Sequence, residues 1–148
     1  MKRAIVKGIL AGLVGTAVMT VAQRLEMSAT GRSPSTVPGE VTARLLGRTE
    51  PNAVANLNLA THWAHGAAMG PLRGALAGMG LRGVTGSAVF FAMMWAGDAM
   101  LYRALDIADR PWRWSAAELA TDIGHKALYA LVTGIAYDTL AGRGRARS

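Results

Sequence analysis

Residues 4–22 read AIVKGILAGLVGTAVMTVA, an apolar run in which Lys7 is the only charged residue. At about 1.5 Å per residue, a helix of this length matches the roughly 30 Å hydrocarbon core of a bilayer. The run ends in the polar residues Gln23 and Arg24 and has no small-residue cleavage site, which is untypical of a secretory signal. We therefore predict that it is a membrane-spanning helix.

Three further segments have the length and apolar character of spanning helices. The second follows Asn52, a residue suited to an N-cap, and contains Pro71, which should kink it. The fourth begins at Ser115 and Glu118, which have the S-x-x-E spacing of a capping box. The predicted helices cover residues 4–27, 53–79, 84–105 and 116–140. Residues 28–52 form a long outer loop, in which residues 38–46 are either a short amphipathic helix or an ordered surface loop.

The composition supports this membrane assignment. Of the 148 residues, 51% are hydrophobic and 17% are charged, whereas about 25% are charged in a typical soluble domain. The absence of cysteine excludes disulfide scaffolds and thiolate metal sites. A net charge of +7 on so apolar a chain is untypical of a nucleic-acid binder, so no nucleic-acid partner is expected. We predict an all-α integral membrane four-helix bundle, a single transmembrane domain over residues 1–148 whose first partner is the lipid bilayer.

The positions of the charges predict an orientation. Most cations cluster at the predicted end that holds both termini, where Asp138 is the one nearby acid. These cations are Lys2, Arg3, Lys7, Arg73, Arg82, Arg143, Arg145 and Arg147. At the other end, five arginines are offset by five acids. The positive-inside rule then places both termini in the cytoplasm.

Two matches within the chain indicate a duplicated hairpin. GLVGTAV at residues 12–18 aligns with GVTGSAV at residues 83–89, and the LAT that precedes His65 aligns with the LAT that precedes His125. Because each half would contain two helices, the halves would be parallel and related by an axis along the membrane normal.

Glycines at four-residue spacing predict close helix packing, because small residues let backbones approach each other in lipid. The predicted packing residues are Gly8, Gly12, Gly66, Gly70, Gly74 and Gly78. Their partner is either a helix of the same chain, a second copy in a homo-oligomer, or another membrane protein.

Ionisable residues within the spans are costly and usually mark a functional site. The candidates are Glu26, His62, His65, Asp98, Asp122 and His125. In two helices they form pairs at i and i+3 that end in histidine, and each of the other two helices adds a carboxylate. This pattern is typical of carboxylate–histidine metal sites in helix bundles, so a transition metal such as Fe, Zn, Mn or Cu is the predicted ligand.

Other interpretations of the same residues stay open. Haem could be held between His65 and His125. A proton or solute path is a further alternative, because histidine titrates near neutrality. The groups could also only pair internally, Asp122 with Lys126 and Asp98 with Arg24. No nucleophile elbow, phosphate loop or zinc-protease motif occurs, so no catalytic residue is assigned and an enzyme is not the leading expectation.

At residues 8–16, at Glu26, and at His65 and His125 in their glycine-rich spans, the chain resembles the YagU-like family of small bacterial inner-membrane proteins. The resemblance implies a helical, multi-pass protein of the bacterial inner membrane. The family has no established activity, so the resemblance implies no catalytic residue. The functional expectation is a membrane protein with an intramembrane His/carboxylate cluster that binds a metal. A non-catalytic assembly subunit and a haem-binding oxidoreductase component are the alternatives.

Overall fold

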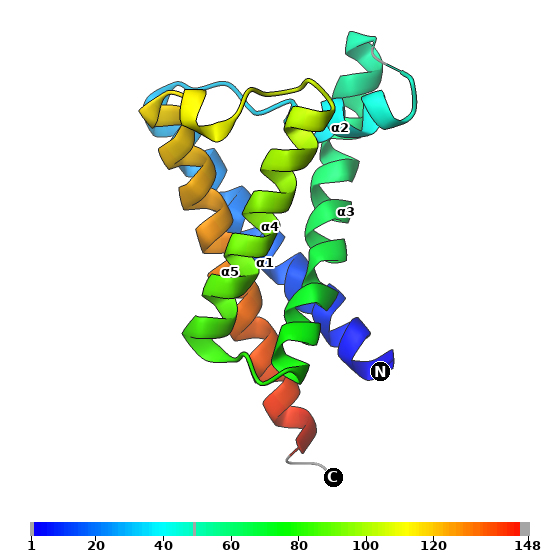
Figure 1. Ribbon diagram of the computed structural model, residues 1–148, viewed down its shortest axis with the longest axis vertical. Helices are drawn as coiled ribbons and strands as arrows, with labels where there is room; N and C mark the ends of the chain where they lie inside the picture. Colours follow the sequence, from blue (N-terminus) through cyan, green and yellow to red (C-terminus); the bar gives the residue numbers. More distant parts are fainter. Residues whose placement is uncertain (1, 49, 146–148) are drawn as a thin grey trace.

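The computed structural model describes residues 2–48 and 50–145, with side chains as far as Gly142, and over these residues the chain is helical without any strand (Figure 1). The helices are α1 (Lys2–Thr30), α2 (Val37–Leu45), α3 (Pro51–Gly78), α4 (Gly83–Ala104), the short 3-10 helix η1 (Pro111–Arg113) and α5 (Ala116–Arg145). The all-α prediction is confirmed. The outer loop contains a helix, α2, and α5 continues beyond its predicted end at residue 140.

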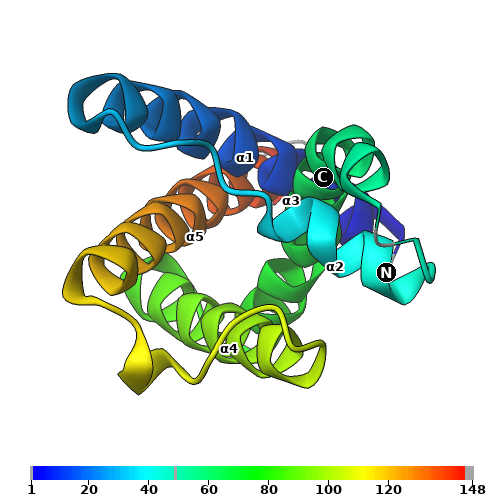
Figure 2. The same ribbon diagram turned by 90° about the horizontal axis from the view of Figure 1, so that it is seen from above.

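The four long helices surround a common centre when the molecule is seen from above (Figure 2). α1 packs against both α3 and α5, while α4 packs mainly against α5 and only lightly against α3. Both termini lie at one end of the molecule, which we call the terminal end (Figure 1). α2 and the α4–α5 connection lie at the other end, which we call the loop end.

Two of the described helices, α1 and α4, are long and apolar enough to cross a membrane. α3 and α5 do not meet the same criterion of length, hydropathy and charge. Both contain ionisable residues within their lengths, such as His62 in α3 and Lys126 in α5. Length and composition therefore support membrane association, but not by themselves four crossings.

Glycines bring α1 and α3 into backbone contact. A methyl group added to Gly12 would overlap the carbonyl oxygen of Gly66, and one added to Gly8 would lie 2.7 Å from backbone atoms of Pro71. Further along, Gly70 faces the backbone of Gly8. The helices thus pack through van der Waals contact between main chains. α3 continues as one helix through Pro71.

The remaining two predicted packing glycines differ from each other. Gly74 lies against the ring of Tyr137 on α5. A methyl group added to Gly74 would lie 3.0 Å from the nearest atom of that ring. Gly78 has open space around it, so it makes no close helix contact among the described residues. The close partners of the other five glycines belong to the same chain.

Arg73, one of the cations predicted at the end that holds both termini, lies inside the bundle. Its side chain is completely buried, and Nη2 lies 2.8 Å from Oδ2 of Asp138 on α5. Nη1 donates to the carbonyl of Leu81, and the same Asp138 oxygen accepts a bond from the backbone N–H of Gly83. Arg73 therefore ties α3 to α5 and to the α3–α4 turn. Of the predicted basic tail, Arg143, Arg145 and Arg147 lie outside the described side chains.

Candidate functional site

A buried ion-pair cluster joins α4 and α5 in the half of the bundle nearer the loop end. Nζ of Lys126 lies 3.0 Å from Oδ1 of Asp122 and 3.2 Å from Oδ2 of Asp98. The side chain of Asp98 is only 7% exposed. A cation between two carboxylates offsets part of the cost of removing all three charges from water. We call Asp98, Asp122 and Lys126, together with His65, the charged cluster.

Two aromatic residues of α4 complete its surroundings. Nε1 of Trp95 donates a 2.8 Å hydrogen bond to Oδ2 of Asp122. Nζ of Lys126 lies 4.9 Å from the ring centroid of Tyr102 and 3.5 Å from its hydroxyl oxygen. An ammonium group near an aromatic face gains cation–π stabilisation, which is larger where water is excluded.

Helical spacing explains how each element supplies these groups. On α4, Trp95, Asp98 and Tyr102 are three and four residues apart, so they share one face. On α5, Asp122 and Lys126 are four apart and also share a face. The side chains meet because these two faces are packed against each other.

His65 brings α3 into the cluster. Its Nε2 lies 3.3 Å from Oδ1 of Asp98, although its side chain is 40% exposed. Neither Nε2 of His65 nor Oδ2 of Asp98 forms a well-directed hydrogen bond within the described residues. With a neutral His65, the two carboxylates and one ammonium leave the cluster with a formal charge of minus one.

His62, one turn away on α3, contacts α1 instead. Its Nε2 lies 3.0 Å from Oγ1 of Thr20. That hydroxyl already donates its single hydrogen to the carbonyl of Thr16, at 2.7 Å. A neutral imidazole with its proton on Nε2 would donate to Thr20 and so satisfy both contacts, which leaves Nδ1 as an acceptor.

A cavity of about 350 Å³ lies near the loop end. We call it the vestibule. All four long helices and the segment between α1 and α2 contribute to its lining. The lining residues are Thr20, Gln23, Arg24, Met27, Arg32, Pro34, Ser35, Val37, Pro38, Asn58, Leu59, His62, Tyr102 and Asp122. Asp122 belongs to the charged cluster, and Tyr102 contacts Lys126 of that cluster. The vestibule therefore borders the charged cluster.

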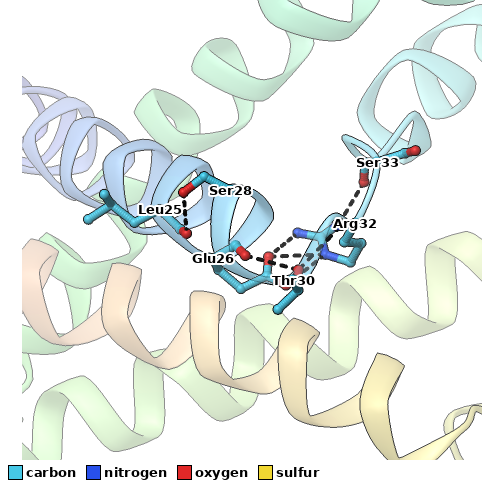
Figure 3. Close-up of polar contacts among 6 residues, drawn as sticks. All are labelled: Leu25, Glu26, Ser28, Thr30, Arg32 and Ser33. Carbon is cyan, nitrogen blue, oxygen red and sulfur yellow. Dashed lines mark hydrogen bonds and ion pairs between the residues drawn. The ribbon is translucent and has the colours of Figure 1, made fainter.

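The segment above the vestibule is held in place by an ion pair (Figure 3). Arg32 donates to both oxygens of Glu26 from Nε and Nη2, with a shortest distance of 2.6 Å. Thr30 donates to the same carboxylate, and Nη1 of Arg32 donates to the carbonyl of Ser33. The hydrogen bond to Glu26 raises the pKa of the Arg32 guanidinium above its ordinary value.

Asn58 fixes the other end of this segment. Its Oδ1 accepts a 2.8 Å hydrogen bond from the backbone N–H of Gly39, and its Nδ2 donates to the carbonyl of Ser35 at 2.9 Å. One amide of α3 therefore holds the start of α2 and the chain before it. The roof of the vestibule is anchored to both α1 and α3.

The six predicted metal ligands contact different partners and do not meet around one point. Within the described residues, no group of three or more His, Asp or Glu side chains could hold a metal ion. Lys126 lies between Asp98 and Asp122, and Arg32 takes both oxygens of Glu26. The structure therefore does not assemble the expected metal centre, because nearby cations occupy the carboxylates.

The two histidines that the internal alignment superposes have different neighbours. His65 contacts Asp98, whereas His125 is half-buried and lies within the electrostatic influence of Glu26, Arg32 and Asp122. This arrangement offers no support for a haem held between the two rings.

Sequence reasoning identified some contacts of the site and missed others. The pairing of Asp122 with Lys126 follows from their i,i+4 spacing, and it is present. The expected pairing of Asp98 with Arg24 is wrong, because Asp98 contacts Lys126 and His65. The parts played by Trp95 and Tyr102 were missed, although their spacing from Asp98 on one face of α4 is visible in the sequence.

Comparisons with protein-family models, with curated proteins and with solved structures find no match to the chain. The resemblance to the YagU-like family stays an expectation. The function must therefore be argued from the geometry of the bundle.

Proposed function

We propose that the chain is a four-span inner-membrane protein that binds a small polar solute in the vestibule, with both termini in the cytoplasm and no catalytic step. The observation that carries this proposal is the vestibule itself, a cavity of about 350 Å³ lined by polar side chains of all four long helices. Binding pockets for small molecules typically have volumes of about 300–1,000 Å³.

The distribution of apolar residues supports a membrane location. Large hydrophobic side chains are exposed on the outside of the long helices, while polar side chains are buried inside the bundle. The exposed ones include Ile5, Val6, Ile9, Leu10, Val14, Val18, Val21, Met93, Met100, Leu131 and Ile135. The buried polar ones include Thr16, Arg73, Ser87, Asp98 and Thr133. This pattern suits lipid outside, because ionisable groups in a membrane protein face the bundle interior.

The orientation rests on charge at the two ends. Lys2, Arg3 and Arg82 are exposed near the terminal end, whereas at the loop end Glu26 pairs with Arg32 and Asp106 with Arg103. The positive-inside rule then favours a cytoplasmic terminal end. The vestibule would open on the opposite side of the membrane.

The layer beneath the charged cluster favours binding over transport. Leu76, Phe90, Met94 and Tyr129 form a packed hydrophobic core between the cluster and the terminal end. Close-packed side chains of this kind leave little room for a solute to pass. The assembly alternative is weakened because most predicted packing glycines already contact helices of the same chain.

Single-cysteine labelling tests the proposal directly, because the chain has no cysteine of its own. In intact cells, a membrane-impermeant maleimide should label Gln23→Cys, which lines the vestibule. Val21→Cys is the matched control, since Val21 is at nearly the same depth of α1 but exposed on the outside, where lipid would cover it. Arg82→Cys should react only after the membrane is permeabilised.

Two results would overturn the proposal. Labelling of Arg82→Cys before Gln23→Cys would reverse the orientation. Equal labelling of Gln23→Cys and Val21→Cys would show that water reaches both faces of α1, as in a protein outside the membrane.

A further inference from the structure

We propose that the vestibule binds a zwitterion, whose carboxylate or phosphate faces Arg24 and whose ammonium group faces Asp122. The inference rests on the function proposed above and adds the chemical class of the ligand. It is carried by the charges that line the cavity and by those in direct contact with them.

Arg24 supplies the attraction for the anionic group. It lines the vestibule, and among the described residues it forms no ion pair and no hydrogen bond. Arg32 lines the same cavity, but Glu26 occupies its Nε and Nη2. Gln23 lies beside Arg24 in the lining and adds a neutral amide donor. A guanidinium group suits both carboxylate and phosphate oxygens.

Asp122 supplies the attraction for the ammonium group. Lys126 contacts both of its oxygens, Oδ1 at 3.0 Å and Oδ2 at 3.3 Å, and Oδ2 also accepts from Trp95. A carboxylate has about four lone-pair sites, so these contacts leave capacity for a further donor from the vestibule. The charged cluster behind Asp122 carries a formal charge of minus one with a neutral His65, which also favours a cationic group.

The balance of charge explains why a zwitterion fits better than a simple anion or cation. The vestibule and its direct contacts contain three cations, Arg24, Arg32 and Lys126. They also contain three carboxylates, Glu26, Asp98 and Asp122. A ligand with a net charge would unbalance this set, and an unpaired charge is costly at the inner end of the vestibule, where the side chains of Lys126 and Asp98 are 14% and 7% exposed. A zwitterion leaves the balance unchanged.

Two sources could supply such a ligand. One is a free solute such as an amino acid. The other is the headgroup of an ethanolamine phospholipid, which carries a phosphate and an ammonium group. The vestibule lies near the loop end, where a membrane would place its headgroups, and Met27, Leu59 and Val37 give part of the lining an apolar character.

The test is calorimetric titration of the full-length protein in lipid-free detergent micelles. The probes are two zwitterions without net charge, alanine and the phosphodiester glycerophosphoethanolamine, and their halves, which are represented by acetate, ethylamine, inorganic phosphate and ethanolamine. At least one zwitterion should bind ten times or more as tightly as either of its halves. Halves that bind as tightly as the zwitterions, or no binding by either zwitterion, would overturn the inference.

Variants assign the two ends of the ligand. Arg24→Gln should weaken zwitterion binding at least tenfold, while Arg48→Gln, an exposed arginine outside the vestibule, should not change it. Asp122→Asn should weaken zwitterion binding and strengthen the relative binding of inorganic phosphate, a change of preference that misfolding would not produce. Unchanged binding in Arg24→Gln, which removes no described contact, would contradict the proposed orientation.

Nanodiscs distinguish the two sources. If the lipid headgroup is the ligand, discs of phosphatidylethanolamine should abolish glycerophosphoethanolamine binding while discs of phosphatidylcholine retain it. If a free solute is the ligand, the two lipids should give equal affinities. Cysteine labelling distinguishes failure of the zwitterion inference from failure of the proposed function. A labelled Gln23→Cys without zwitterion binding would refute only this inference, while an unlabelled one would refute the proposed function.

Discussion

The buried pair of Arg73 and Asp138 gives an unusual prediction about stability. Arg73 is completely buried, whereas the side chain of Asp138 is 30% exposed. Asp138→Asn would leave a buried guanidinium without its counter-ion, which typically costs about 3–5 kcal/mol. Arg73→Met would leave an aspartate that still reaches water and still accepts from the N–H of Gly83. We expect that variant to lose only about 1–2 kcal/mol, from the lost hydrogen bonds.

The double variant makes the argument refutable. Once Arg73 is replaced by methionine, the charge that made Asp138→Asn costly is gone, so Arg73→Met/Asp138→Asn should be more stable than Asp138→Asn alone. The two sites are in contact, and a coupling energy of at least about 1 kcal/mol is expected.

The measurement is reversible unfolding in mixed detergent and dodecyl sulfate micelles. Far-ultraviolet circular dichroism follows the helices, and the change in midpoint at constant slope gives the change in the free energy of unfolding. The prediction is refuted if the double variant is less stable than Asp138→Asn, or if Arg73→Met is the more harmful single change. Either result would mean that Arg73 does not need Asp138 to neutralise its buried charge.

Three further predictions are tested by the same unfolding assay or by elemental analysis. Gly12→Ala should destabilise the bundle by about 1–3 kcal/mol, because its methyl group would overlap the Gly66 carbonyl. Gly78→Ala, which has open space, should be neutral or stabilising by up to about 1 kcal/mol, and equal effects would contradict close α1–α3 packing. Trp95→Phe should cost about 1.5–3 kcal/mol by removing the hydrogen bond to the Asp122 carboxylate, and an unaltered midpoint would count against that bond. Elemental analysis of purified protein should find less than one equivalent of Fe, Zn, Mn or Cu. Stoichiometric metal lost in His65→Ala would restore the metal-site hypothesis.

The approximate positions of the helices could be predicted because hydropathy acts locally, but the predicted N-cap Asn52 is wrong, since α3 begins at Pro51 and its N-cap is Glu50. The first predicted helix, residues 4–27, lies within α1. The side chain and backbone N–H of Ser115 both reach Glu118 at the start of α5, as the capping box requires. The boundaries were less accurate, since a helix such as α5 can continue through Gly142 where no competing contact stops it.

The contacts between helices could not be predicted, because spacing fixes which residues share a face but not which face meets which helix. Asp98 was predicted as a metal ligand or, alternatively, as the partner of Arg24, and the structure pairs it with Lys126 and His65. Its partner was uncertain from sequence, since Arg24 and Lys126 both lie at a compatible depth, and the packing of α4 on α5 selects Lys126. Arg73 shows the same limit, because its rim position in the sequence pattern gave no sign that Asp138 would be its partner.

Among the ion pairs of the described residues, those of Arg73 and Lys126 join different long helices, and their surroundings suggest different roles. Towards the terminal end, Arg73 is completely buried and contacts Asp138, the α3–α4 turn and the ring of Tyr137. That group connects helices and does not line the vestibule. At the loop end, Asp122 belongs to the charged cluster and also lines a cavity of about 350 Å³. Because this second group borders a cavity, it can exchange one of its partners for a solute without opening the bundle, which is why we place the function there.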